Sequence, residues 1–198
     1  MRFGRRFHTH VVPEWVNTYI DYNRFKSQLK LETRLQGKQH RRLVEFDANS
    51  RPDFSVPLKI DAAAAAARSF YISELDRTSE KVERLLESVV SVTADSTQFT
   101  AFEFVSMLAE CLDLRNHVLK LCWYVAVNGE GLNRLRSKYR KLNGSLNTSS
   151  LDFSRFAYAG QSKCAALLNS LLHALSAFDL AQIRQSAMRA ALPLPQIR

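Results

Sequence analysis

The sequence contains few residues that break or cross-link a chain. Its 198 residues include six glycines, five prolines and three cysteines. So few breakers, together with 46% hydrophobic residues, argue against wholesale disorder, and the length suffices for one domain with a real core. Alternation of period two is nearly absent, whereas apolar spacing near 3.6 recurs along the chain, so the sequence predicts an all-α protein.

Long uncharged apolar runs are also missing. No stretch reaches the roughly 20 apolar residues that a membrane span needs, and no apolar region follows the charged first ten residues as in a secretory signal. We therefore expect a soluble, cytoplasmic chain, either free or held at a membrane through a parent protein. Because Cys111, Cys122 and Cys164 lie in apolar helical stretches without metal-ligand spacing, we expect them to be buried, reduced thiols.

Acidic residues are too few to balance the basic ones. The 28 lysines and arginines exceed the 19 aspartates and glutamates, which leaves a formal net charge of +9. Such an excess points to an acidic partner. Nucleic acid, an anionic membrane and a phosphorylated small molecule all meet that description.

The apolar pattern predicts a single domain over residues 1–198, in which a helical hairpin packs on a helical bundle. The expected parts are an N-terminal hairpin (1–35), a polar loop (36–60), two long antiparallel helices (61–127), a short basic helix (131–142) and a C-terminal helical segment (150–190).

Local signals set the expected helix ends. Pro13 suits the first turn of the second hairpin helix, and Asp61 is a good N-cap before six alanines. Thr100 and Glu103 stand at capping-box spacing, which predicts the start of the second long helix. Asn128 and the glycine after it predict the end of that helix, and a separate basic helix should follow.

The segment GLNRLRSKYRKLNG, residues 131–144, gathers positive charge on one helical face. Arg134, Lys138 and Lys141 fall within about 60° on a wheel of about 100° per residue. Like charges one turn apart destabilise a helix, and no acidic residue within the segment offsets them. A multiply charged anion would reverse this balance. A solvated cationic face explains this segment equally well when the segment is considered alone.

A second basic cluster lies in the predicted hairpin. Tyr22, Lys26 and Lys30 follow one another four residues apart and share a broad helical face, and Arg2 adds charge nearby in the sequence. If the hairpin faces the basic helix, the two clusters can surround one anion.

Two segments resemble the SPX domain family. MRFGRRF with VPEWVNTYIDYNRFKSQLK, within residues 1–30, resembles the opening hairpin of these domains, and NGEGLNRLRSKYRKLN, residues 128–143, resembles their later lysine-rich segment. The resemblance implies a domain without catalysis or cofactor that binds inositol polyphosphates or pyrophosphates. It also implies that the domain reports phosphate status to an attached transporter, exporter or polyphosphate polymerase domain, or to a regulated partner protein. We expect the chain to be the N-terminal part of a larger protein.

The resemblance also implies a set of ligand-binding residues. Tyr22, Lys26 and Lys138 match the phosphate-binding cluster of the family, and Arg134 and Lys141 match two lysines of a neighbouring basic cluster. The complete set of residues expected to contact the ligand is Tyr22, Lys26, Lys30, Lys138, Arg134, Lys141 and Arg2. Ser137 stands where the family usually has a lysine, so ligand preference or affinity can differ from the usual.

Two other functions stay open from the residues alone. A basic amphipathic helix can lie on nucleic-acid phosphates, although we find no recognised DNA- or RNA-reading motif and expect no nucleic-acid partner. A helical bundle with a basic face can also serve protein interaction alone. An enzyme or a metal site is not expected, because His8 and His10 point to different faces of a short helix and have no identifiable cysteine or carboxylate partner.

Overall fold

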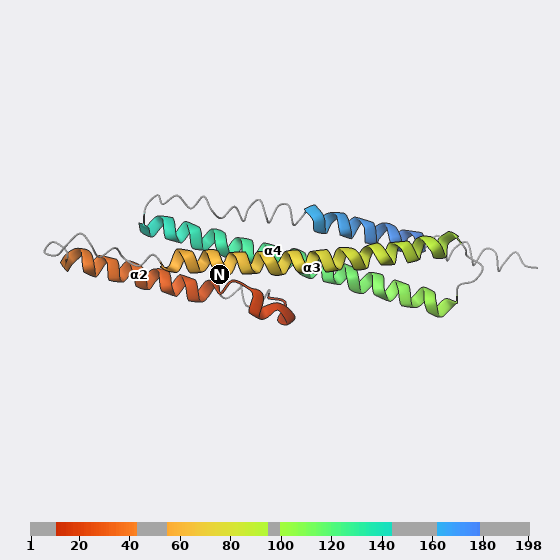
Figure 1. The fold of residues 1–198 in the computed structure, drawn as a ribbon, viewed down its shortest axis with the longest axis horizontal. Helices are drawn as coiled ribbons and strands as arrows, with labels where there is room; N and C mark the ends of the chain where they lie inside the picture. The colour runs from red at the N-terminus through yellow and green to blue at the C-terminus, as the bar shows by residue number, and fades with distance from the viewer. Residues whose placement is uncertain (1–10, 43–54, 95–99, 144–161, 179–198) are drawn as a thin grey trace, which may run out of the picture. The chain divides into compact units, whose positions relative to one another are not determined.

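The computed structural model describes residues 11–42, 55–94, 100–143 and 162–178, and the regular elements over these residues are all helical (Figure 1). In chain order they are the 3-10 helix η1 (Pro13–Thr18) and the α-helices α2 (Tyr22–Arg42), α3 (Ser55–Ala94) and α4 (Ala101–Asn143), followed by a helix over 162–178. The predicted all-α class is confirmed. The expectations for residues 1–10, including Arg2, lie outside the described residues.

The two long helices α3 and α4 are antiparallel, as predicted. Ala67 on α3 contacts Tyr124 on α4, whereas Glu74, further along α3, contacts His117, further back on α4. The chain forms two compact units, and both helices pass through them. The first unit comprises Met1–Ser73 with Cys122–Gln161, and the second comprises Glu74–Leu121 with Ser162–Arg198.

Tyr124 is the centre of the aromatic core in the first unit. Its ring lies 4.6 Å from that of Tyr19, 5.2 Å from that of Phe70 and 5.9 Å from that of Trp15, measured between centroids. The contacts with Trp15 and Tyr19 are edge-to-face. Aromatic pairs in this arrangement stabilise a fold by more than the burial of their apolar area alone. The Tyr124 hydroxyl donates a hydrogen bond to the carbonyl of Thr18 at 2.8 Å. The end of η1 is thereby held against α4.

The second unit packs the helix over 162–178 on α4. The rings of Phe104 and Phe178 meet edge-to-face at 5.2 Å, and the buried Cys111 thiol donates to the carbonyl of Leu171 at 3.6 Å. The three cysteines are not linked by disulfides; Cys111 and Cys164 are buried as expected, whereas Cys122 is half-buried. The buried residues that α3 and α4 contribute here include Leu75, Val82, Leu85, Val118 and Leu121.

The capping box at the start of α4 is confirmed. The Glu103 carboxylate accepts a hydrogen bond from the Thr100 backbone N–H at 3.0 Å, and the Thr100 hydroxyl oxygen accepts one from the Glu103 N–H at 3.3 Å. The bonds that the carboxylate accepts from the Thr100 N–H and hydroxyl lower the pKa of Glu103. Two N–H groups at a helix start, which have no partner within the helix, are satisfied in this way.

The predicted break at Asn128 is wrong, since α4 continues through it to Asn143. The expected basic helix over 131–142 is the last part of this one helix. Gly129 and Gly131 are both buried inside α4. A glycine in a helix costs about 1 kcal/mol relative to alanine. Packing of the surrounding residues outweighs that cost.

The predicted loop over 36–60 is also too long. Helix α2 continues through Gly37 to Arg42, and α3 begins at Ser55 rather than at Asp61. Pro57 lies in the first turn of α3, where a helix needs no backbone N–H from that residue. Val56 and Ile60 are buried, so this early turn belongs to the core.

The second hairpin helix is divided into two pieces. The 3-10 helix η1 ends at Thr18 and α2 starts at Tyr22, so the expected continuous helix from Pro13 is wrong. The Asp21 carboxylate accepts a hydrogen bond from the Arg24 N–H at 2.9 Å and caps the start of α2. The aspartate in YIDYNRF is the sequence signal for this start.

Candidate functional site

The cap at Asp21 determines which residues the first turns of α2 present. Tyr22 is the first residue of α2, and Lys26 and Lys30 follow at one and two turns. Residues four apart lie on the same side of an α-helix. Phe25 and Leu29, on the neighbouring side, are buried and hold α2 against the core.

Lys26 lies over the ring of Tyr22. Its ammonium nitrogen is 5.7 Å from the ring centroid, within the range of a cation–π interaction. The Tyr22 side chain is only 7% exposed, so the ring is fixed by the core beneath it. Tyr22 therefore limits the positions that the charged end of Lys26 can take.

The last turns of α4 supply the other basic residues. Leu132, Leu135 and Tyr139 are buried and hold this part of α4 in the core of the first unit. Lys138 is half-buried at the edge of that core, whereas Arg134 and Lys141 are exposed on the same helix. The predicted amphipathic character of this segment is thus present.

Lys138 lies close to two lysines of α2. Partial burial and the positive charges of Lys30 and Lys26 lower the pKa of Lys138. Residues more than one hundred positions apart in the sequence thus share one electrostatic environment. Several ammonium groups held together repel each other, and a bound anion with several negative charges would turn this repulsion into attraction.

Arg134 has a partner that the sequence prediction overlooked. Its guanidinium forms an ion pair and hydrogen bond with the carboxylate of Glu130, one turn earlier on α4. Glu130 lies just before the basic segment, in the NGEG run, at the i,i+4 spacing that favours such a pair. The charge of Arg134 is therefore partly offset by Glu130.

The structure thus brings together three of the predicted ligand residues, Lys26, Lys30 and Lys138, and places Tyr22 directly beneath Lys26. We define the α2–α4 basic surface as Tyr22, Lys26 and Lys30 of α2 with Arg134, Lys138 and Lys141 of α4. Arg2 lies outside the described residues. All six residues of the surface belong to the first compact unit.

Within the described ranges, no group of three histidine, cysteine, aspartate or glutamate side chains is placed to hold a metal ion. In the same parts of the chain, no helix is long and apolar enough to cross a membrane.

Comparison with known proteins identifies the family. A family model described as the SPX domain matches residues 1–154. The fold also matches a solved SPX domain, that of glycerophosphodiester phosphodiesterase 1 from Chaetomium thermophilum in complex with inositol hexakisphosphate. The TM-score is 0.73 at 19% sequence identity, and the match covers 90% of this chain and 99% of that one. The family model spans both halves of the α2–α4 basic surface, and the chain belongs to the SPX domain family.

Proposed function

We propose that the α2–α4 basic surface binds inositol polyphosphates or pyrophosphates. The observation that carries this proposal is the convergence of Lys26, Lys30 and Lys138; partial burial and then the charges of Lys30 and Lys26 lower the pKa of Lys138. A related SPX domain of the same fold has been solved with inositol hexakisphosphate. This support comes from charge and family together, because a basic surface alone fits several anions.

The chemistry of the surface suits a ring that carries many phosphates. Lysine ammonium groups act as compact point charges with three donors each, so neighbouring lysines can each contact a different phosphate oxygen. A charge-assisted hydrogen bond contributes about 1.5 to 3 kcal/mol. Because these residues are at least partly exposed to solvent, binding should weaken as salt concentration rises.

The proposed roles differ from residue to residue. Lys26, Lys30 and Lys138 bind the phosphates that lie deepest on the surface, with Tyr22 orienting Lys26 and offering its hydroxyl. Arg134 and Lys141 contact phosphates at the edge of the surface. To do so, the Arg134 guanidinium must either bind Glu130 and a phosphate together or break its ion pair with Glu130. Arg2 would add a further contact from the N-terminal segment.

The same proposal gives the chain a regulatory role. Binding at this surface connects the hairpin to α4, and a ligand that prefers one arrangement of these helices shifts the population toward it. We propose that the domain binds its ligand without catalysis and reports cellular phosphate status. It would do so to an attached transporter, exporter or polyphosphate polymerase domain, or to a partner protein, in the cytosol.

Calorimetric titration tests the proposal directly. Wild type should bind inositol hexakisphosphate, and Lys138→Ala should lose about 1.5 kcal/mol or more of binding free energy, a factor of about ten. The matched control is Lys81→Ala, an exposed lysine of α3 in the other compact unit, which should bind like wild type.

Competition separates this function from the alternatives. If duplex DNA or RNA protects the protein against thermal unfolding and inositol hexakisphosphate does not, the surface is a nucleic-acid site and the proposal is wrong. If neither ligand binds, the basic surface serves protein interaction, and the proposal is again wrong.

A further inference from the structure

Asn128 is a polar residue inside α4 that does not favour the helical conformation. Its side chain is 0% exposed, in the middle of a 43-residue helix. Asparagine forms helices less readily than alanine or leucine, and a buried amide destabilises the fold unless its hydrogen bonds are made. The reason for an asparagine here therefore lies outside the helix.

The hydrogen bonds of Asn128 connect α4 to the start of α2. Its Oδ1 accepts a bond from the backbone N–H of Ile20 at 3.0 Å, and its Nδ2 donates to the carbonyl of Tyr124 at 3.1 Å. The carbonyl of Ile20 in turn accepts a bond from the N–H of Tyr22 at 2.8 Å. Two consecutive hydrogen bonds thus lead from Asn128 to the first residue of α2.

Tyr124 holds the other end of the same short stretch. Its hydroxyl donates to the carbonyl of Thr18 at 2.8 Å. The chain between η1 and α2 is therefore attached to α4 on both sides of Tyr19. We call Asn128 and Tyr124, with their bonds to Ile20 and Thr18, the α4 clamp.

The α4 clamp acts on the part of the chain from which α2 starts. Since a helix moves approximately as a rigid body over a few turns, the place and direction of its first residue determine where Lys26 and Lys30 lie. Lys138 is ten residues beyond Asn128 on α4, or about 15 Å along the axis at about 1.5 Å per residue. The position of Lys26 and Lys30 relative to Lys138 thus depends on the hydrogen bonds that attach residues 18–22 to α4.

We infer that Asn128 is a positioning residue for the ligand site, which places the lysines of α2 opposite Lys138 through its hydrogen bond to Ile20. This inference rests on the proposed function and deepens it, because it assigns a role to a buried residue that no ligand can touch. An acceptor at residue 128 is required, and an apolar side chain of similar size cannot replace it.

The test is a double-mutant cycle with inositol hexakisphosphate as the probe. Dissociation constants are measured for wild type, Lys26→Ala, Asn128→Leu and the double variant. In the wild-type background, Lys26→Ala should weaken binding about tenfold. Asn128→Leu should itself weaken binding about tenfold and reduce the effect of Lys26→Ala to less than about threefold, because Lys26 is then no longer in place.

A buried neighbour supplies the control. Val125→Ala removes packing from the same helix at a residue that is 1% exposed, and it removes no hydrogen-bonding group of the α4 clamp. It should lower the stability and keep the full tenfold effect of Lys26→Ala. General loss of stability is thereby distinguished from loss of position.

The outcomes separate the inference from the proposed function. If wild type does not bind the probe, the proposed function and this inference both fail. If wild type binds and Asn128→Leu binds equally well, or Lys26→Ala costs the same in both backgrounds, the inference is wrong and the proposed function stands. If circular dichroism shows that Asn128→Leu does not fold, Asn128→Ala decides, because it removes the same acceptor without adding bulk. That variant should also reduce the effect of Lys26→Ala, and an unchanged effect overturns the inference.

Discussion

Glu130 and Arg134 form an ion pair one turn apart on α4, beside the lysines of the α2–α4 basic surface. Both side chains are about half exposed, at 48% and 51%, so the pair is worth little to the stability of the fold. If the surface binds a polyanion as proposed, we expect the larger effect of this pair to be on binding. A carboxylate at this position repels an incoming polyanion and occupies a guanidinium that a phosphate could use.

Removal of that carboxylate should strengthen ligand binding. Glu130→Gln is expected to tighten the binding of inositol hexakisphosphate by about threefold to tenfold, because it removes a negative charge and releases Arg134. Calorimetry at low salt measures the effect. Glu110→Gln, at an exposed position of α4 in the other unit, is the matched control. Unchanged or weaker binding in Glu130→Gln would show that Arg134 does not meet the ligand.

Lys138 should be unfavourable for stability and favourable for binding. Since burial and the charges of Lys30 and Lys26 lower its pKa, the folded state disfavours its charged form at neutral pH. Lys138→Met keeps most of the apolar stem and removes the charge. We expect a free energy of unfolding equal to that of wild type or higher by up to about 0.5 kcal/mol, together with a smaller thermal shift caused by inositol hexakisphosphate. A clearly less stable variant that keeps its thermal shift would contradict this prediction.

Tyr124 should make the fold sensitive to alkali. Burial raises the pKa of Tyr124 to about 12, so its neutral form is favoured in the folded state. This contribution is complete below pH 10, the value for an unfolded tyrosine, and is lost as the pH rises toward about 12. Tyr124→Phe should cost about 1 kcal/mol at pH 8, because a hydrogen bond is lost.

Urea unfolding at a series of pH values measures that loss. The stability difference between wild type and Tyr124→Phe should shrink or change sign above pH 10, with a total change on the order of 2 kcal/mol. A stability difference that stays constant across this range would show that the pKa of Tyr124 is the same in the folded and unfolded states, which would contradict this prediction.

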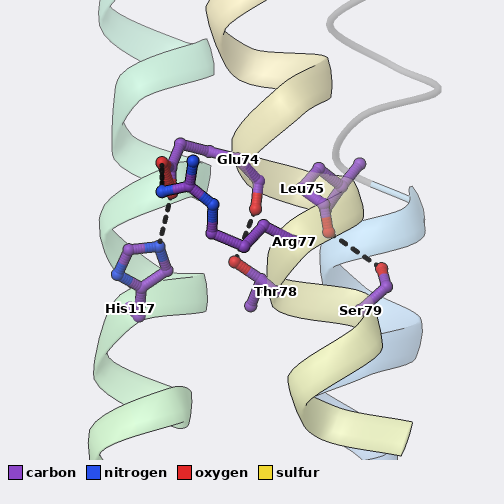
Figure 2. A network of polar contacts seen from close by, with 6 residues as sticks. All are labelled: Glu74, Leu75, Arg77, Thr78, Ser79 and His117. Atoms are coloured by element: carbon purple, nitrogen blue, oxygen red, sulfur yellow. Dashed lines mark hydrogen bonds and ion pairs between the residues drawn. The ribbon is translucent and has the colours of Figure 1, made fainter.

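His117 connects α3 and α4 in the second unit. Its Nε2 lies 3.5 Å from the carboxylate of Glu74, which also binds Arg77 at 3.0 Å (Figure 2). Burial lowers the pKa of His117, the Glu74 carboxylate opposes this, and the charges of Lys81 and Lys120 add to the lowering. Neutral His117 is therefore favoured in the folded state.

Acid should destabilise the fold at His117, because burial and the nearby lysines disfavour its charged form more than Glu74 favours it. With a lowered pKa, the contribution of His117 is present above about pH 6.5 and is lost as the pH falls through the folded-state value. Because its side chain is 35% exposed, we expect only a few tenths of a kcal/mol. Chemical unfolding of wild type and His117→Gln at pH 7.5 and pH 5.5 measures it. Wild type should lose more stability than the variant, and an equal loss would assign the acid sensitivity to other groups.

The all-α class and several local features could be predicted from the sequence alone. The period of apolar residues, the capping box of Thr100 and Glu103, and the four-residue spacing of Tyr22, Lys26 and Lys30 depend on neighbours within a few positions. Such features are local, so the residues themselves contain the necessary information. The resemblance to the SPX family came from two short segments and is confirmed by the family model over residues 1–154.

Only the tertiary structure decided the course of α4 and the meeting of the two basic clusters. Asn128 and Gly129 are locally unfavourable in a helix, but α4 continues through both, and the Asn128 side chain binds Ile20, 108 positions away. In the same way, the effect of Lys26 and Lys30 on Lys138 depends on how α2 packs against α4. Long-range packing can outweigh local preferences of about 1 kcal/mol per residue, and those preferences are all that a short stretch of sequence expresses.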